Sequence, residues 1–386
     1  MKVNFCISGI PATGGIRAIF EYANGLRRKG HTVTITIPYR DTKPTWFDLE
    51  AALIMPSESD QAKTDDRQYS QLHEMPEELK TYAQYIQRRT NTEQNLLLLM
   101  PDCDINIATD FPTAIPVYLS KKGKGCYFMQ HYERLFADAR PFDSLIEALD
   151  ADYTYHLPLV KIANSSWLKN IIWEKFEAES YLCCNGVNLD HFHPLANTKD
   201  DNRLTIASFS GNGVAWKGFK DAVAAMKIVF DQTRDKNIVW KVYGGAPEVT
   251  TEDAGIPFEY VGQVYKEKLT ELYNEADIVF LSSWYESFPL PPLEAMACGT
   301  PVVVTEYGTE DYAIDGETAL VVTPRQPEEL AKAILTLIDN PKKRDYIARN
   351  GIDCVRKFSW QNAVINMENI LGEIAAGARP PIYQNG

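Results

Sequence analysis

Two glutamates and a lysine in the second half of the chain have residue types and spacing suited to binding a sugar and a diphosphate. Glu286 and Glu294 lie eight residues apart, and Lys217 ends the run Gly-Asn-Gly-Val-Ala-Trp-Lys. A carboxylate accepts hydrogen bonds from the hydroxyls of a sugar or a ribose, and a lysine can neutralise a diphosphate. Taken singly, each also fits a solvated surface residue with no role.

The segment between the two glutamates predicts a helix amino terminus. Pro291 and Pro292 suit the first turn of a helix, which would place Glu286 in the preceding loop and Glu294 in the first turns. Main-chain N–H groups between the two carboxylates would then be available to phosphates. Such an arrangement offers one carboxylate to a sugar hydroxyl and the other to a ribose, although two unrelated acidic residues on a solvated helix also fit.

A second glycine-rich loop, Gly9 to Gly15, follows the first predicted strand. It lacks the G-x-G-x-x-G spacing of a dinucleotide fold, and it lacks the lysine and hydroxyl residue of a P-loop, because Ile16 and Arg17 follow Gly15. Both patterns argue against a nicotinamide cofactor and against a P-loop. Glycine backbone at a helix amino terminus can still receive an anion such as a diphosphate, although a tight turn without a ligand fits equally well.

The elements that must position these residues alternate between strands and helices. The first half reads as strands at 3–8, 32–37, 105–109, 125–129, 161–164 and 181–183, with a helix at 16–29 and further helical segments between them. A polar connector, 196–203, precedes a second series, with strands at 204–210, 238–243, 278–282 and 301–305 and helices at 219–230, 266–275 and 327–339. Both halves are predicted to be parallel, doubly wound sheets, with ligands at the carboxyl ends of the strands in a central cleft between two facing domains.

Length, composition and charge support this reading. With 386 residues the chain exceeds the roughly 100 to 200 residues of a single domain. A hydrophobic fraction of 45% supplies sizeable cores, and a net charge of -13 argues against binding of nucleic acid. The seven cysteines have no regular spacing, and Cys6, Cys126, Cys183 and Cys184 lie in apolar runs, which predicts buried thiols in a reducing, cytoplasmic compartment.

No export signal is recognised, and the longest aliphatic run, 96–100, is far shorter than the approximately 20 residues of a membrane-spanning helix. The sequence therefore predicts a soluble protein that is at most peripheral to the inner face of a membrane. Lys121, Lys122 and Lys124 could face anionic lipid there, or form an ordinary solvated loop.

The ordered set of motifs resembles the retaining GT-B glycosyltransferases of family four, the glycosyl transferases group 1. The resemblance covers nearly the whole chain. It is carried by Gly14-Gly15, Asn185-Gly-Val-Asn188 with Phe192 and Pro194, Lys217-Gly218, Glu286 and Glu294 with Glu-Ala-Met-Ala-Cys-Gly-Thr-Pro-Val-Val, and Phe358-Ser-Trp360.

The resemblance implies a GT-B fold with an acceptor-binding domain over 1–195, a nucleotide-sugar-binding domain over 200–357, and a helical segment over 358–386 that crosses back to the first domain. It further implies retaining transfer of a sugar from a nucleoside diphosphate donor to a glycan, lipid-linked or protein acceptor, in glycan or surface polysaccharide synthesis. Neither a metal nor another cofactor is required. The stretch 126–133 is somewhat similar to bacterial rhamnosyltransferases, so a deoxythymidine diphosphate rhamnose donor would fit.

Site residues follow from the same resemblance. Lys217 would stabilise the leaving diphosphate, Glu286 would contact the donor sugar, Glu294 would bind the ribose, and His131 would lie beside the reacting carbon. Phosphate and sugar would be approached by the loop at Gly14 and Gly15 and by the backbone of Ser287, Phe288, Pro289 and Leu290. His131 also fits a histidine with no catalytic role.

One position departs from the family. An arginine usually precedes the lysine by five residues, and here that residue is Asn212. Because asparagine donates hydrogen bonds but carries no charge, stabilisation of the leaving group would rest more on Lys217. If only a charge is missing, Asn212→Arg would strengthen diphosphate binding; if Gly211 and Gly213 adopt positive φ, the loop is shaped around asparagine and the larger side chain would block the donor.

Three other functions remain open from the sequence. A sugar-nucleotide epimerase of GT-B fold would use similar diphosphate chemistry, and a non-catalytic sugar-nucleotide-binding module would explain Asn212. A metal-dependent GT-A transferase would find the spacing of its metal-binding carboxylates at Asp102 and Asp104 or at Asp150 and Asp152. Both acidic pairs also fit solvated turns.

Overall fold

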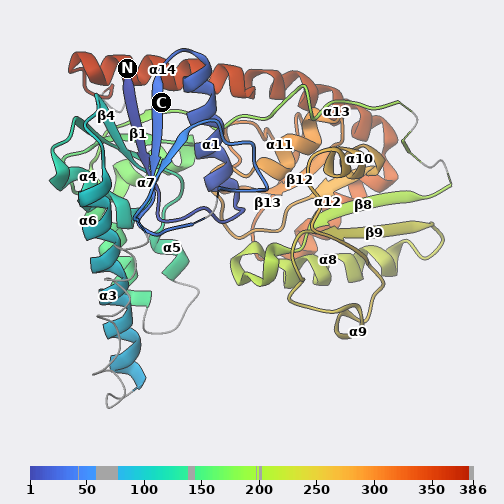
Figure 1. Ribbon diagram of the computed structural model, residues 1–386. Coiled ribbons are helices and arrows are strands. Elements are labelled where there is room, and N and C mark those ends of the chain that lie inside the picture. Colours follow the sequence, from blue (N-terminus) through green and yellow to red (C-terminus); the bar gives the residue numbers. More distant parts are fainter. Residues whose placement is uncertain (42, 58–76, 138–143, 197, 200–201, 382–386) are drawn as a thin grey trace. The chain divides into compact units, whose positions relative to one another are not determined.

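The protein consists of two compact units, each containing one parallel sheet, in a computed structural model (Figure 1). The structure describes residues 1–41, 43–57, 77–137, 144–196, 198–199 and 202–381. The first unit comprises Met1–Cys184 together with Ala363–Gly386, and the second comprises Asn185–Asn362. The chain therefore returns to its first unit at the end.

The first unit contains a seven-stranded sheet in the order β3-β2-β1-β4-β5-β6-β7. Its strands are β1 (Lys2–Cys6), β2 (Thr32–Thr36), β3 (Ala52–Ile54), β4 (Ile105–Ala108), β5 (Lys124–Met129), β6 (Val160–Ala163) and β7 (Ser180–Leu182). All neighbouring pairs run parallel. The strand order reverses between β1 and β4, so a binding crevice is expected at their carboxyl ends.

Helices cover both faces of this sheet, so most residues of its strands are buried, including the polar Asn4, Asn106 and Lys161. The helices are α1 (Gly14–Arg28), α3 (Glu77–Leu99), α4 (Phe111–Ser120), α5 (Arg134–Ala137), α6 (Ser144–Tyr155), α7 (Ser166–Phe176) and α14 (Trp360–Ala376). Tyr127 and Ala163 point to the core shared with α3, α4, α6 and α7. On the other face Tyr22 of α1 packs edge-on against Phe128, with ring centroids 5.2 Å apart.

Helix α14 packs against α1 through a glycine. A Cβ atom on Gly25 would lie 2.3 Å from Cγ2 of Val364, so only glycine permits this close approach. The carboxyl end of α14 is capped by Lys124, whose Nζ donates to the carbonyls of Ile374 and Ala375 at 2.9 and 2.7 Å. Lys122 similarly donates to the carbonyl of Met100 after α3. Two of the three lysines considered for lipid binding thus bond to backbone carbonyls near helix carboxyl ends.

The second unit contains a six-stranded parallel sheet in the order β10-β9-β8-β11-β12-β13. The strands are β8 (Leu204–Phe209), β9 (Ile238–Tyr243), β10 (Glu259–Gly262), β11 (Ile278–Phe280), β12 (Val302–Thr305) and β13 (Leu320–Val322). The helices are α8 (Phe219–Gln232), α9 (Thr251–Ala254), α10 (Glu267–Glu275), α11 (Leu290–Ala297), α12 (Pro327–Asp339) and α13 (Pro341–Val355), with short 3-10 turns at Gly211–Gly213, Ala215–Lys217 and Arg356–Phe358. Here the strand order reverses between β8 and β11.

The chain passes between units earlier than the predicted connector. The change lies between Cys184 and Asn185, not within 196–203. Val187 explains this difference, because its N–H donates to the carbonyl of Phe358 at 2.7 Å and its carbonyl accepts from the N–H of Trp360 at 3.2 Å. A Cβ on Gly186 would lie 2.7 Å from the nitrogen of Trp360. Two distant motifs of the sequence therefore meet in one short parallel bridge.

Three further comparisons with the sequence concern small elements, thiols and membranes. The short strands β3, β10 and β13 were not predicted. Each lies at an edge of its sheet, and β3 and β10 contain no fully buried residue, so no buried apolar run marks those two. All seven cysteines are free thiols, and Cys184 is only partly buried, unlike its neighbour Cys183. Within the described residues no helix is both long and apolar enough to cross a membrane.

Candidate active site

Lys217 and Glu286 meet in the second unit beyond the carboxyl ends of β8 and β11, the strands between which the order reverses. The Nζ atom of Lys217 lies 2.6 Å from Oε1 of Glu286. The same oxygen accepts a hydrogen bond of 2.7 Å from the hydroxyl of Ser283. Glu286 is 8% exposed. The two residues that the sequence predicted for one site thus form a partly buried ion pair.

The loop that carries Lys217 is fixed to the loop after β11. Gly218 has φ +68°, and a Cβ on it would lie 2.0 Å from the carbonyl oxygen of Ser282. The hydroxyl of Ser282 donates to the carbonyl of Lys217 at 3.2 Å, and the N–H of Trp284 donates to the carbonyl of Trp216 at 2.7 Å. Glycine is required at 218 because of both its conformation and this close approach. The contacts fix the starting point of the lysine side chain.

Glu286 is fixed from the other side by the turn at Tyr307 and Gly308. The N–H of Glu286 donates to the carbonyl of Tyr307 at 3.3 Å. Gly308 has φ +83°, and a Cβ on it would lie 2.2 Å from the carbonyl oxygen of Glu286. Sequence reasoning missed this support, because a lone Gly308 between polar residues has no spacing that relates it to Glu286.

Glu294 is in α11 and is 2% exposed. The hydroxyl of Tyr273 donates to its Oε2 at 3.4 Å, and the hydroxyl of Tyr243 lies 3.0 Å from that of Tyr273. Desolvation raises the pKa of Tyr273 well above its ordinary value, and the nearby Tyr243 and Glu294 raise it further. Tyr273 therefore stays protonated and can donate a hydrogen bond to the carboxylate.

The segment Ser287–Leu290 connects the two glutamates but serves partly as core. The ring of Phe288 packs against those of Tyr312 and Phe358, with centroids 5.4 and 5.8 Å apart. The carbonyl of Pro289 accepts a 3.0 Å hydrogen bond from the hydroxyl of Tyr312. Residues two and three of α11 are prolines, which have no N–H group. The amides that could reach a phosphate are therefore fewer than a typical helix start offers.

Asn212 shapes its own loop. It has φ +53° and ψ 34°, between Gly211 at φ +75° and Gly213 at φ +72°. Its Oδ1 accepts a 2.5 Å hydrogen bond from the N–H of Gly245, and its own N–H donates to the hydroxyl of Ser210. Asparagine is among the few residues that tolerate this left-handed conformation. Of the two alternatives for this position, the geometry fits the loop built around asparagine.

Gly14 and Gly15 begin α1 in the first unit, two residues earlier than predicted. The hydroxyl of Thr13 caps the helix by accepting from the N–H of Ile16. Neither glycine has a positive φ, and a Cβ on Gly14 would meet nothing within 4 Å. Packing within the described chain therefore does not explain glycine at 14, and the space beside it is open to a ligand.

His131 follows β5 in the first unit and is 9% exposed. Its Nδ1 lies 3.0 Å from the carbonyl oxygen of Tyr132, and its ring packs against Phe136 and Trp167. Because a carbonyl only accepts hydrogen bonds, Nδ1 carries the proton in the neutral ring and Nε2 is the basic atom. The imidazole is thus held in one tautomer and one orientation.

The acidic pairs considered for a metal have other contacts. Asp104 accepts a 2.7 Å hydrogen bond from the N–H of Lys2. Asp150 bonds to Tyr85 and to Arg89, and Asp152 bonds to Tyr132 and forms an ion pair with Arg134. Within the described residues no cluster of three or more potential metal ligands is found. These contacts give Asp104, Asp150 and Asp152 structural explanations.

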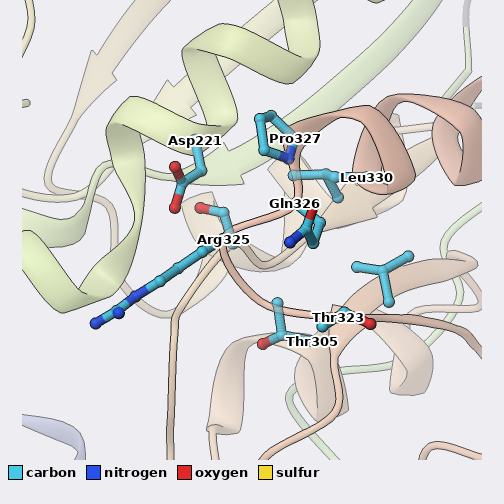
Figure 2. Close-up of a pocket in the computed structure, with 9 residues that line it drawn as sticks. Asp221, Thr305, Thr323, Arg325, Gln326, Pro327 and Leu330 are labelled. Atoms are coloured by element: carbon cyan, nitrogen blue, oxygen red, sulfur yellow. The ribbon is translucent and has the colours of Figure 1, made fainter.

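A small pocket at the carboxyl ends of β11, β12 and β13 was not predicted. Figure 2 shows its lining, which includes Asp221, Thr305, Thr323 and Arg325. The guanidinium of Arg325 lies 3.9 Å from the ring centroid of Trp284, whose Nε1 donates to Asp221 at 2.6 Å. These contacts hold Trp284 in the Ser282–Trp284 loop, which in turn bonds to the backbone of Trp216 and Lys217. No sequence motif links Arg325 to Trp284, because a cation–π pair has no fixed spacing.

Comparison with known proteins identifies part of the chain. Residues 195–353 match the sequence profile described as glycosyl transferases group 1. These residues belong to that family. The match covers Lys217, Glu286 and Glu294, and it confirms the predicted family for this part of the chain.

Curated relatives align over a limited length. The D-inositol 3-phosphate glycosyltransferase of Corynebacterium glutamicum (strain R) is 28% identical over 183 residues, which are 44% of this chain and 44% of that protein. The chain spans about half or less of the length of the first relatives that it matches.

Solved structures align over nearly the whole chain. Sucrose-phosphate synthase from Thermosynechococcus elongatus has a TM-score of 0.76 at 18% identity, over 98% of this chain and 100% of that one. HepE from Anabaena, in complex with UDP-glucose, has a TM-score of 0.70 at 16% identity, over 98% and 100%. The chain has the GT-B fold, as predicted.

Proposed function

We propose that the protein is a retaining glycosyltransferase that moves a sugar from a nucleoside diphosphate sugar to an acceptor. The observation that carries this proposal is the ion pair between Lys217 and Glu286 beyond the reversal point of the second sheet. A diphosphate bound there would meet a cation held by a carboxylate, and a donor sugar would meet the carboxylate itself. UDP-glucose in the structural relative HepE supports this class of donor.

Lys217 supplies the charge for the leaving group. As the bond between the sugar and the diphosphate breaks, negative charge develops on the diphosphate, and an ammonium already in place stabilises it without reorganisation. The hydrogen bond from Ser283 to Glu286 leaves the carboxylate oriented while Lys217 turns toward the phosphates. Glu286 then accepts hydrogen bonds from hydroxyls of the donor sugar.

Glu294 binds the nucleoside. A buried carboxylate held by Tyr273 can accept hydrogen bonds from both ribose hydroxyls, and its burial strengthens them. The backbone N–H groups of Ser287, Phe288 and Leu290 approach the phosphates. Asn212 contributes loop shape rather than charge, so Lys217 carries more of the electrostatic stabilisation than it would beside an arginine.

The first unit binds the acceptor, and Gly14, Gly15 and His131 are the residues we assign to it near the reacting groups. Open space beside Gly14 lets backbone approach a phosphate or sugar. The tautomer with the proton on Nδ1 makes Nε2 the ring atom of His131 that would accept a hydrogen bond from a sugar hydroxyl. These roles do not require a divalent cation.

One experiment separates this function from its rivals. The full chain is incubated with UDP-glucose, and in parallel with deoxythymidine diphosphate rhamnose, with and without a mixture of sugar acceptors and excess chelator. NMR follows the anomeric protons. A glycoside with the anomeric configuration of the donor, formed in the presence of chelator, supports the proposal. An epimerised donor supports the epimerase, and loss of product on chelation with rescue by manganese supports a metal-dependent transferase.

A further inference from the structure

Polar side chains follow three adjacent strands at the reversal point of the first sheet. Ser8 follows β1, Asp110 follows β4 and Gln130 follows β5, and these strands are neighbours in the sheet. In the register, Cys6 pairs with Ala108, which pairs with Tyr127. The three polar residues therefore leave the sheet at nearly the same level. Such an edge is where an open α/β sheet binds its ligand.

Two carboxyl groups already fill the helix amino terminus at this edge. Asp110 is the N-cap residue of α4, and Oε2 of Glu133 accepts from the N–H of Phe111 at 2.8 Å and from the hydroxyl of Tyr127 at 2.9 Å. Burial raises the pKa of both carboxyl groups. A helix amino terminus normally favours an anion, but these two groups occupy the position that a phosphate would need.

Buried polar atoms at the same edge lack protein partners. Both amide atoms of Gln130, Oε1 and Nε2, are buried, and neither has a hydrogen-bond partner among the described residues. The carboxyl group of Asp110 is buried at the same edge and interacts with Ser8 and Thr113. Leaving such a group unpaired costs about 1 to 3 kcal/mol, so a missing partner is expected. Gln130 stands beside the loop assigned to the reaction, because a Cβ on Gly15 would lie 3.9 Å from its own Cβ.

The chemistry of these atoms selects a neutral hydroxyl group. The amide of Gln130 offers one acceptor and one donor group, and a sugar hydroxyl can satisfy either of them. A phosphate can only accept from the amide, and the N–H of Phe111, which would otherwise be available to it at the start of α4, already donates to Oε2 of Glu133. A phosphate would therefore find one amide donor and an N–H group already in use, whereas a neutral hydroxyl can pair with either atom of the amide.

We propose that Gln130 and Asp110 bind hydroxyls of the acceptor, and that this acceptor is an uncharged sugar or polyol at this subsite rather than a phosphate ester. This inference rests on the proposed function, because the bound sugar is an acceptor only if the protein is a transferase. It sets the chain apart from those matched relatives that are named D-inositol 3-phosphate glycosyltransferases. Gln130 forms hydrogen bonds with hydroxyls of the acceptor. Asp110 and Glu133 occupy the amino terminus of α4, where a phosphate would otherwise bind.

The test is ligand-observed NMR on the full chain in the presence of UDP. The probes are myo-inositol, methyl α-glucoside and methyl α-mannoside, each against a phosphate ester: inositol 3-phosphate, glucose 6-phosphate and mannose 6-phosphate. We expect at least one neutral member to bind about tenfold or more tightly than its ester, the factor that corresponds to roughly 1.4 kcal/mol. Tighter binding of the esters, or no binding by any neutral probe, would overturn the proposal.

Two variants and a control locate the binding. Gln130→Ala is expected to weaken the neutral probe about tenfold, the loss of a hydrogen bond of ordinary strength. Asp110→Asn keeps a side-chain oxygen for the helix cap. It is expected to reduce the ratio between the affinity for the neutral probe and the affinity for its phosphate ester. Glu174→Gln removes an exposed carboxylate of α7 and is expected to leave both affinities unchanged. Parent-like affinities in both Gln130→Ala and Asp110→Asn would contradict the assignment.

Binding of UDP in the same samples distinguishes this inference from the proposed function. If UDP binds and glycoside forms but the esters are preferred, the inference fails and the transferase stands. If UDP does not bind while a neutral sugar binds in a Gln130-dependent manner, the sugar subsite stands and the proposed donor fails.

Discussion

The Nζ atom of Lys217 lies 2.6 Å from Oε1 of Glu286, and the two residues come from loops that follow β8 and β11. Their side chains are 25% and 11% exposed, so the pair is partly screened from water but open to a ligand. Under the proposed function, a bound donor replaces the ion pair: its phosphates pair with Lys217 and its sugar hydroxyls with Glu286, so neither charged side chain is left without a partner. Displacing the lysine from Glu286 costs the ion pair and gains contacts to both phosphates and sugar.

Gly308 provides a test of how Glu286 is positioned. We expect Gly308→Ala to lower transfer about tenfold or more, because its Cβ would lie 2.2 Å from the carbonyl of Glu286 and must displace it. Gly316→Ala is the matched control, since Gly316 has φ +71° but nothing within 4 Å of an added Cβ. Both variants place alanine at a positive φ, so the backbone strain is similar in the two. Equal rates of transfer in the two variants would argue against a role of Gly308 in positioning Glu286.

The conformation of Asn212 predicts that an arginine at this position weakens nucleotide binding, whereas a loop that merely lacked a charge would bind the nucleotide more tightly with arginine. We expect Asn212→Arg to weaken binding of UDP, because arginine in the left-handed region is strained and loses the hydrogen bond to the N–H of Gly245. Asn212→Gly keeps the backbone conformation and is expected to lose affinity by about 1 kcal/mol or less, for the side-chain bond alone. Calorimetry with UDP compares the three proteins. Tighter binding by Asn212→Arg would mean that the loop has room for a cation.

Glu286 and Glu294 are expected to affect different steps. Glu286→Gln keeps the size of the side chain but loses its charge, and we expect it to lower kcat more than the affinity for UDP. Glu294→Gln is expected to weaken UDP binding by about 1 to 3 kcal/mol, the range for a hydrogen bond to a charged group. Calorimetry and steady-state kinetics separate the two effects. Parent-like UDP affinity in Glu294→Gln would remove the ribose role.

Lys161 gives the first unit a pH-dependent stability. Burial lowers the pKa of its ammonium group to about 8, and Nζ donates to the carbonyl of Leu157 at 2.9 Å. The unfolded chain, with a lysine pKa of about 10.4, binds more protons between pH 8 and 10.4, so this group's contribution to stability increases with pH across that window. Below pH 8 the full cost of the buried charge remains.

Lys161→Met is therefore expected to raise the free energy of unfolding by about 1 to 3 kcal/mol at pH 7 and by less at pH 10. Lys2→Met, at an exposed position of β1, is the control and is expected to change little at either pH. Urea denaturation at the two pH values measures both. A gain that is the same at pH 7 and pH 10 would show that packing, not the charge, is responsible.

The sequence predicted the two sheets well because buried parallel strands are continuous apolar runs and their helices are amphipathic. The bounds of β9 and α12 agree with the predicted ranges to the residue. The short strands β3, β10 and β13 were missed; all three lie at sheet edges, and β3 and β10 contain no fully buried residue. The bridge at Val187 was missed as well, because nothing local relates it to Ser359.

Within the candidate site, residue types and spacing were enough to select Lys217 and Glu286, but not the contacts that hold them. Ser283, Ser282 and Gly308 act through single hydrogen bonds or close approaches that have no periodic signal. The conformation of Asn212 likewise depends on Gly245, which is distant in sequence. Polar residues after β1, β4 and β5 become a cluster only once the strand order is known.

The most direct test of the account measures transfer by Lys217→Ala beside Lys220→Ala. Lys220 is a neighbouring lysine with an exposed ion pair to Glu248, so its loss removes the same net charge from nearly the same place. With UDP-glucose as donor, or deoxythymidine diphosphate rhamnose if the parent uses it, the rate of donor consumption is measured under saturation. The account predicts a loss of about 100-fold or more for Lys217→Ala, the scale for removing one group that stabilises developing charge, and a rate close to the parent for Lys220→Ala. A rate for Lys217→Ala within about threefold of the parent, far below that scale, would contradict it.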